Sequence, residues 1–359
     1  MDGLSDRTQN PTTGTSNRRR DIINFLFRFQ SYFGLIIVFL LAILISPVRN
    51  DANLFLKPNN LLNIVLYASE TGVLAVGMTL VILVAGIDLS VGSIMALVGC
   101  AAGVLLMQDH DVVLPILGTI TVGHWPAIVI ILSMLLLGLI IGFVNGWASE
   151  QFKVQSFITT LAMLSIARGL AHIVSADNSI PLAYGPNLGD PLFKALGQPL
   201  GDTGIPVPTL VMLISALIVG LLLSLTSFGR HVYAVGGNPT AARLSGINVT
   251  RLRIVVFMLC GMFASIAGML HTSRLNQGSP NESVGYELNA IAAVVIGGAS
   301  LQGGKGTIWG SIGGALILQI LDNIMGLNNV SSNVQLVVKG LLVIAAVALQ
   351  QLRPQEAEA

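Results

Sequence analysis

The chain has 359 residues, of which 53% are hydrophobic and only 10% are charged, and its formal net charge is +1. An average soluble domain carries about 25% charged residues, so the composition argues against a soluble enzyme, a disordered protein and a nucleic-acid-binding protein. It indicates instead a polytopic membrane protein, which crosses the bilayer several times.

Long apolar runs divide the chain. Runs such as residues 128–141 are continuous rather than alternating, so they predict transmembrane helices and not the strands of a barrel. We expect an all-α polytopic membrane helix bundle with about ten transmembrane helices. The eighth apolar segment is short and rich in Gly and Ala, so it either spans the membrane or re-enters it. The expected spans are residues 31–47, 62–84, 91–107, 126–147, 156–175, 207–227, 252–272, 288–302, 307–327 and 334–351.

The polar ends and the loops set the orientation. Residues 1–28 predict a disordered basic N-terminal tail, residues 29–351 a transmembrane domain, and residues 352–359 a C-terminal tail. With the N-terminus inside, twelve of the 18 Lys and Arg residues fall on the cytoplasmic side and four fall outside. This is the positive-inside pattern, and an even number of spans then makes both termini cytoplasmic.

A polar break separates the second and third expected spans. Asp88 and Ser90 interrupt the apolar run there, between Gly86 and Gly92. Either polar side chain can cap the helix that follows, which predicts a tight turn at the inner surface. An ion bound at Asp88 is the alternative.

Several polar or charged side chains lie within the expected spans or close to them. Ionisable groups inside a membrane are costly and point to function, although they also pair with one another, reach towards the interface or bond between helices. The candidates for the lining of a translocation path are Glu70, Asn145, Arg168, Asn289 and Asp322.

The longest cytoplasmic loop, residues 228–251, predicts one short helix of about seven residues. Asn238 is placed to cap this helix, with Pro239 at its first position and Gly246 after its end. A helix this short is marginal in water by itself. It therefore needs a docking surface, either on its own bundle or on a partner protein.

Signals for catalysis are weak. The run Gly303-Gly304-Lys305 suggests a phosphate-binding loop, but Ala299 and Gly306 occupy positions where that motif requires Gly and Ser or Thr. The five histidines show no metal-ligand spacing. We therefore expect no enzyme, no ATPase site and no cofactor bound by this chain.

Three long stretches together carry a family resemblance. They are Gly77–Ser93 (GMTLVILVAGIDLSVGS), Gly229–Val249 (GRHVYAVGGNPTAARLSGINV) and Gly285–Gly306 (GYELNAIAAVVIGGASLQGGKG). In this order they resemble the permease subunits of bacterial monosaccharide ABC importers, over about residues 30–350.

The resemblance implies a function and a set of partners. Such permeases form dimers in the inner membrane, work with a separate cytoplasmic ATPase that hydrolyses ATP and receive a monosaccharide, such as ribose or a similar pentose or hexose, from a periplasmic binding protein. By this resemblance the loop helix is a coupling helix that inserts into a groove of the ATPase. Its residues are Asn238, Ala241, Ala242, Arg243, Leu244, Ser245 and Gly246.

The resemblance also implies that spans two to five and seven to ten form related halves, which alternate between outward and inward access. The expected partners are a second permease protomer, the ATPase, the binding protein, the sugar and the bilayer. Nucleic acid is not expected as a partner. The alternative function is an ion-coupled secondary transporter of a small polar solute, with Asp322 as one proton site. A passive channel and a membrane enzyme have less support, because no filter sequence and no catalytic cluster is present.

Overall fold

The computed structural model describes residues 30–107, 110–114, 118–122, 125–183, 190–201 and 204–351. The predicted tails, residues 1–28 and 352–359, lie outside this range. The described chain is a bundle of helices with very little strand, which confirms the expected all-α class. The helices are α2 (Gln30–Ile45), α3 (Pro58–Leu83), α4 (Val91–Met107), α5 (Ala127–Phe152), α6 (Ser156–Ser175), α7 (Pro191–Ala195), α8 (Val207–Leu225), α9 (Ser227–Gly237), α10 (Pro239–Leu244), α11 (Val249–Leu275), α12 (Tyr286–Ile296), α13 (Ile308–Leu327) and α14 (Ser332–Gln351).

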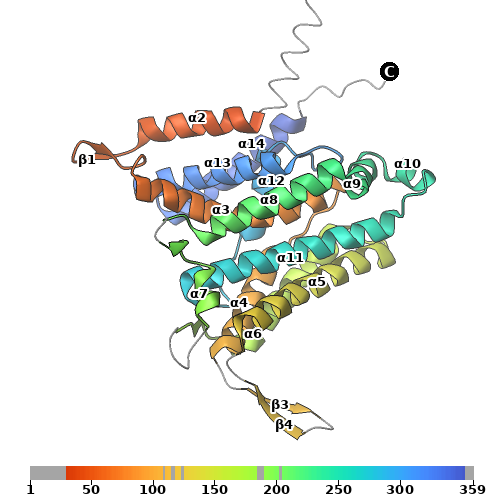
Figure 1. Ribbon diagram of the computed structural model, residues 1–359. Helices are drawn as coiled ribbons and strands as arrows, with labels where there is room; N and C mark the ends of the chain where they lie inside the picture. The colour runs from red at the N-terminus through yellow and green to blue at the C-terminus, as the bar shows by residue number, and fades with distance from the viewer. Residues whose placement is uncertain are drawn as a thin grey trace, which may run out of the picture.

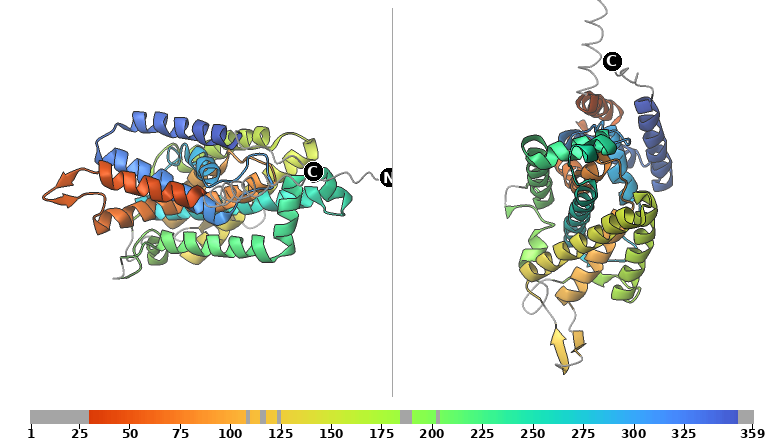
Figure 2. Two further views of the ribbon diagram at one scale, coloured as in Figure 1. Left: turned by 90° about the horizontal axis from the view of Figure 1, so that it is seen from above. Right: turned by 90° about the vertical axis from the view of Figure 1, so that its right-hand side faces the viewer.

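The long helices lie side by side, as Figure 1 shows, with α9 and α10 at one end of the bundle and strand β1 at the opposite end. The right-hand view of Figure 2 looks along the bundle and shows several helices end-on. The basic loop between α8 and α11 assigns the α9–α10 end to the cytoplasm. The opposite end is therefore the outer end.

Each of the ten expected spans contains a helix. Helices α3, α5, α6, α8, α11 and α13 are long and apolar enough to cross a membrane, whereas α2, α4, α12 and α14 contribute shorter apolar stretches. Helix α12 has only 11 residues, which is about 16 Å at 1.5 Å per residue. The hydrocarbon core is about 30 Å thick, so the eighth apolar segment does not span as a helix by itself.

Short strand pairs join some of the loops. The antiparallel pairs within the loops are β1 (Val48–Arg49) with β2 (Ala52–Asn53) and β3 (His110–Leu114) with β4 (Gly118–Val122). A third pair joins β5 (Ile180–Pro181) to β6 (Gln277–Gly278), with Ile180 opposite Gly278. This last pair ties the loop after α6 to the end of α11.

Helices α5 and α11 pack with their backbones in contact. Gly138, Gly142 and Gly146 lie on one face of α5, four residues apart. A Cβ atom at Gly142 would overlap the backbone carbonyl of Phe257, and one at Gly138 would overlap that of Gly261. Lipid gives two helices no hydrophobic reason to associate, so close van der Waals contact between small residues has to hold them together.

Two segments interrupt the bundle. The inner break, which we define as residues 85–90, follows α3, and the outer break, residues 276–285, follows α11. A Cβ atom at Gly92, in the first turn of α4, would overlap the Glu287 carboxylate at the start of α12. Tyr286 in turn reaches Glu70, halfway along α3. Helices α4 and α12 therefore begin close together, deep inside the bundle, and the inner break is longer than the tight turn that the sequence predicts.

The breaks belong to two halves of the bundle that pack alike. Helix α11 packs against α4 and α5, just as α3 packs against α12 and α13. Helix α4 packs against α6, and α12 packs against α14. Helix α3 runs towards the cytoplasm and α11 runs away from it. The two sets of helix contacts therefore repeat each other with opposite direction across the membrane. This repeat pairs spans two to five with spans seven to ten, as the resemblance implies.

Candidate functional site

The short helix α10 forms as the sequence predicts. The Asn238 side chain accepts hydrogen bonds from the backbone N–H groups of Thr240 and Ala241, and Pro239 occupies the first turn. Gly246 has φ +85°, a left-handed conformation that ends the helix. Ala242 is the one buried residue of α10, whereas the Leu244 side chain is 86% exposed. Most of this helix is therefore free to contact another molecule.

A second helix, α9, precedes α10, and sequence reasoning missed it. Thr226 caps it by accepting a hydrogen bond from Gly229 N, and its buried residues Val232, Val235 and Gly236 recur at a helical spacing of three and four. That spacing was the signal available in the sequence. The loop between the sixth and seventh spans therefore holds two helices rather than one.

Helix α9 fixes α10 to the inner loops of the bundle. The Tyr233 hydroxyl donates a hydrogen bond to Gly306 O at 2.9 Å, and burial raises the pKa of this tyrosine, so it keeps its proton. Gly236 lies directly against Leu83 O and Gly304 N. A movement of α10 therefore reaches the end of α3 and the loop before α13.

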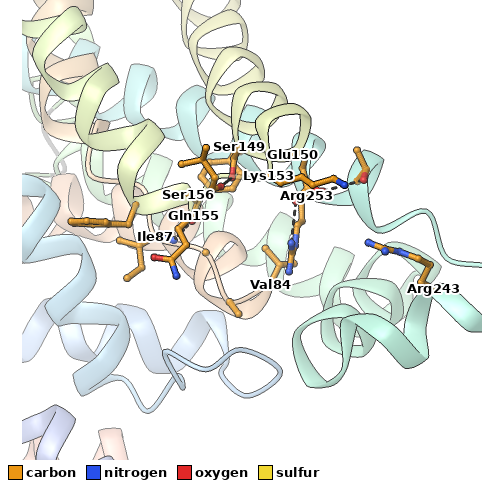
Figure 3. A pocket seen from close by; sticks show the side chains of 15 residues that line it. Val84, Ile87, Ser149, Glu150, Lys153, Gln155, Ser156, Arg243 and Arg253 are labelled. Carbon is orange, nitrogen blue, oxygen red and sulfur yellow. Dashed lines mark hydrogen bonds and ion pairs between the residues drawn. The ribbon is translucent and has the colours of Figure 1, made fainter.

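A cleft of about 820 Å³ opens beside α10 (Figure 3). It lies between the inner break, the α5–α6 corner, α10 and the start of α11, and its lining carries three basic side chains, Lys153, Arg243 and Arg253, and one acidic side chain, Glu150. Arg253 Nη1 lies 3.0 Å from Glu150 Oε1 and so joins α11 to α5. The cleft is therefore a polar, basic recess at the cytoplasmic end.

A charged network occupies the outer half of the bundle. Glu70 of α3 is fully buried, and its carboxylate accepts hydrogen bonds from Arg274 Nε at 2.5 Å and from the Tyr286 hydroxyl at 3.2 Å. His271 Nδ1 lies 2.8 Å from Glu70 Oε2, and His271 Nε2 lies 3.5 Å from Glu282 Oε2. These contacts join α3, α11, the outer break and α12.

Helix α6 holds both breaks. Its Ser156 and Thr160 hydroxyls accept hydrogen bonds from Ile87 N and Leu89 N in the inner break. Further along the same helix, Arg168 Nη1 donates to the carbonyls of Pro280, at 2.5 Å, and Glu282, at 2.8 Å, in the outer break. The interrupted segments thus take part of their hydrogen bonding from side chains, as irregular backbone at membrane depth requires.

The five candidate path residues do not form one site. Arg168 contacts the outer break, whereas Glu70 contacts the ends of the two helices beside it, α11 and α12. Asn145 bonds to Ser90, the last residue of the inner break, and Asp322 of α13 pairs with Lys339 of α14 at 2.8 Å. Asn289 is half-buried on α12, one turn after its start.

Sequence reasoning missed the partners of Glu70. His271 and Arg274 are three residues apart near the end of α11 and therefore share a face, which is the signal that could have found them. Arg274 follows the expected span of residues 252–272, and the structure places it in the last turn of α11. Nothing in the sequence pattern marks Glu282 or Glu287 as a site residue, because their contacts depend on the fold of the outer break.

The family model of permease components of branched-chain amino acid transport systems matches residues 60–347. The chain belongs to this permease family. Together with the apolar helices, this membership makes it a multi-pass protein of the inner membrane and a transporter subunit.

Individual members of the family are similar over nearly their whole length. The ribose import permease protein RbsC of Escherichia coli (strain K12) is 40% identical over 336 residues, which cover 94% of this chain and 97% of that protein. RbsC of Bacillus subtilis (strain 168) is 38% identical over 94% of this chain and 97% of its own. The L-arabinose ABC transporter permease protein AraH of Azospirillum brasilense is 35% identical over 91% and 89%. No solved structure matches the chain.

Proposed function

We propose that this permease is the membrane subunit of an ATP-driven ABC importer, and that it carries a monosaccharide, ribose or a similar pentose or hexose, into the cytoplasm. The observation that carries the proposal is the 40% identity to a ribose import permease over 94% of the chain. The chain binds no cofactor, and a separate cytoplasmic ATPase hydrolyses the ATP. A second permease protomer completes the membrane part, and a periplasmic binding protein delivers the sugar.

Helix α10 is the coupling helix of this proposal. Its exposed residues enter the ATPase, and α9 passes the movement to the ends of α3 and to the loop before α13. ATP binding can drive transport only if it favours one access state of the permease over the other. The direct packing of α9 on both inner loops supports this route.

Transport by the reconstituted system tests the proposal. Vesicles that hold the permease, its ATPase and ATP should take up labelled ribose or arabinose when the binding protein is added outside. Uptake should continue when ionophores collapse all ion gradients. If uptake needed an ion gradient and no ATPase, the chain would be the ion-coupled secondary transporter instead.

Charge reversal at Arg243, Arg243→Glu, should abolish association with the ATPase without loss of folding. Arg243 is exposed in the last turn of α10, so the substitution disturbs no internal contact. The measurement is co-purification of the ATPase with tagged permease, together with size-exclusion chromatography of the permease alone. Arg49→Glu, an exposed position at the outer end, is the control and should keep the ATPase. Normal co-purification of the Arg243→Glu variant would remove α10 from the coupling role.

The sugar path proposed here passes the point where α4 and α12 begin. Arg168 and Glu287 are half-buried there and interact electrostatically, while Val284 and Leu288 beside them are strongly exposed. Half-exposed charges at this depth face water or protein rather than lipid. Guanidinium and carboxylate groups bond to the hydroxyls of a sugar, and the apolar side chains contact its CH face.

Removal of either charge should lower sugar uptake by about tenfold or more, since a hydrogen bond to a charged group contributes about 1.5–3 kcal/mol. The variants are Arg168→Gln and Glu287→Gln, and Arg49→Gln is the matched control. Uptake is measured in vesicles over a range of concentrations of the sugar-loaded binding protein, beside ATPase co-purification. Unchanged uptake by both variants would show that the sugar does not pass these two residues. Loss of ATPase co-purification would indicate a folding defect instead.

A further inference from the structure

Asp88 in the inner break is completely buried. Its exposed fraction is 0%, and its Oδ1 atom accepts hydrogen bonds from Ser90 N at 2.9 Å and from Ser90 Oγ at 2.6 Å. Its Oδ2 atom has no hydrogen-bond partner among the described residues. One oxygen of this carboxyl group is therefore satisfied and the other is not.

The neighbours of Asp88 are neutral. Asn145 of α5, 1% exposed, donates a hydrogen bond to Ser90 Oγ at 2.9 Å. The Asn145 amide and the thiol of Cys260, a buried residue of α11, also interact with the Asp88 carboxyl group, and both are uncharged donors. Within the described residues, no Lys, Arg or His pairs with Asp88. A negative charge here would have no compensating positive charge.

Two acceptor oxygens of the cluster stay unpaired within the described part of the chain. Asn145 Oδ1 is the second buried oxygen of this group without a partner among the described residues, after Asp88 Oδ2. Both atoms are acceptors when Asp88 is ionised, and each unsatisfied acceptor in a buried site costs free energy. One proton on Asp88 Oδ2 turns an unsatisfied acceptor into a donor.

The energies favour the neutral acid. Burial of a lone charge costs more free energy, even after relaxation, than the N-terminus of a helix such as α4 returns. The bonds from Ser90 do not require ionisation, because the carbonyl oxygen of a carboxylic acid accepts them as well. A metal ion would need several more oxygen ligands than this cluster offers.

We propose that Asp88 is a neutral carboxylic acid in the folded permease, and that it positions Ser90 and Asn145 at the start of α4 rather than binding an ion. Asp88 is then a positioning residue, and transport does not require a negative charge at this position. Its hydrogen bonds hold Ser90 at the N-terminus of α4, and Ser90 in turn holds Asn145 of α5.

The decisive comparison is between Asp88→Asn and Asp88→Ala. Asparagine keeps an oxygen acceptor and supplies N–H donors in place of the acid O–H, so Asp88→Asn should keep uptake within about twofold of wild type. Its pH profile should match wild type, and replacement of Na⁺ by K⁺ should change neither protein. Asp88→Ala leaves the Ser90 hydroxyl and Asn145 without this partner and should lower uptake by about tenfold or more, as the loss of a buried hydrogen-bond network does. A folded Asp88→Asn permease that is inactive, or uptake that depends on Na⁺ or on a proton gradient through Asp88, would overturn the proposal.

Infrared spectroscopy decides the protonation state directly, even if the Asn variant fails to fold. The protein used is the full permease with carbon-13-labelled aspartate and an Asp322→Asn substitution, which removes the aspartate of the α13–α14 pair. At mildly alkaline pH it should show the carbonyl stretch of a protonated aspartic acid. The absence of that band would mean that Asp88 is ionised and would overturn the proposal.

Discussion

Replacement of Glu70 by alanine should destabilise the permease by about 3–5 kcal/mol, the usual cost of removing one partner from a buried ion pair. The Glu70 carboxylate is fully buried and receives Arg274, His271 and Tyr286. Without it, the Arg274 guanidinium remains in the bundle with no carboxylate beside it. The ends of α11 and α12 on either side of the outer break also lose these bonds to α3, so uptake should fall together with stability.

The measurement for Glu70→Ala is denaturant or thermal unfolding of the purified permease in detergent. Asp177→Ala is the matched control, because Asp177 also pairs with a histidine, His172 at 2.7 Å, but its side chain is 83% exposed. Exposed pairs contribute about 0–1 kcal/mol, so this control should unfold like wild type. Unfolding curves that coincide for both variants would show that the Glu70 network does not stabilise the bundle.

The substitution Gly142→Ala should destabilise the contact between α5 and α11 by about 2–3 kcal/mol, as overpacking of a tight interface does. The added Cβ overlaps the backbone carbonyl of Phe257. Backbone atoms cannot rotate out of the way as a side chain can, so the two helices must separate along this face. The contacts that hold helices together in lipid are then lost along several turns.

Gly340→Ala provides the comparison for Gly142→Ala. Gly340 lies within α14, and no atom lies within 4 Å of an added Cβ. There the same substitution should be neutral or should stabilise the helix by about 0.5–1 kcal/mol, because alanine favours helix more than glycine does. Both proteins are compared by thermal unfolding and by yield in the membrane. Equal stability of the two variants would mean that α5 and α11 tolerate a wider separation.

The spans and the α10 helix could be predicted from the sequence because local signals determine them. Continuous apolar runs mark the spans, and Asn238, Pro239 and Gly246 mark the ends of α10 by their capping chemistry. The expected helix count also depended on the placement of the positive charges. None of these signals requires knowledge of which helices touch.

The centre of the bundle could not be predicted in the same way. Glu70 and Arg274 are 204 residues apart in the sequence, and their ion pair exists only because α3 packs against α11. The short length of α12 and the depth of the outer break likewise follow from tertiary contacts. Arg168, predicted as a path candidate because it is charged, has backbone carbonyls as its hydrogen-bond partners, and such partners leave no mark on the sequence.

Helix α6 contacts both breaks and therefore links them mechanically. It binds the inner break through Thr160 and the outer break through Arg168, two points separated by about 12 Å of continuous helix at 1.5 Å per residue. A regular helix transmits an axial shift or a rotation along its length with little compression. The inner break and the outer break are therefore held by one continuous helix, and a shift of the cytoplasmic end of α6 reaches the outer break without a separate relay.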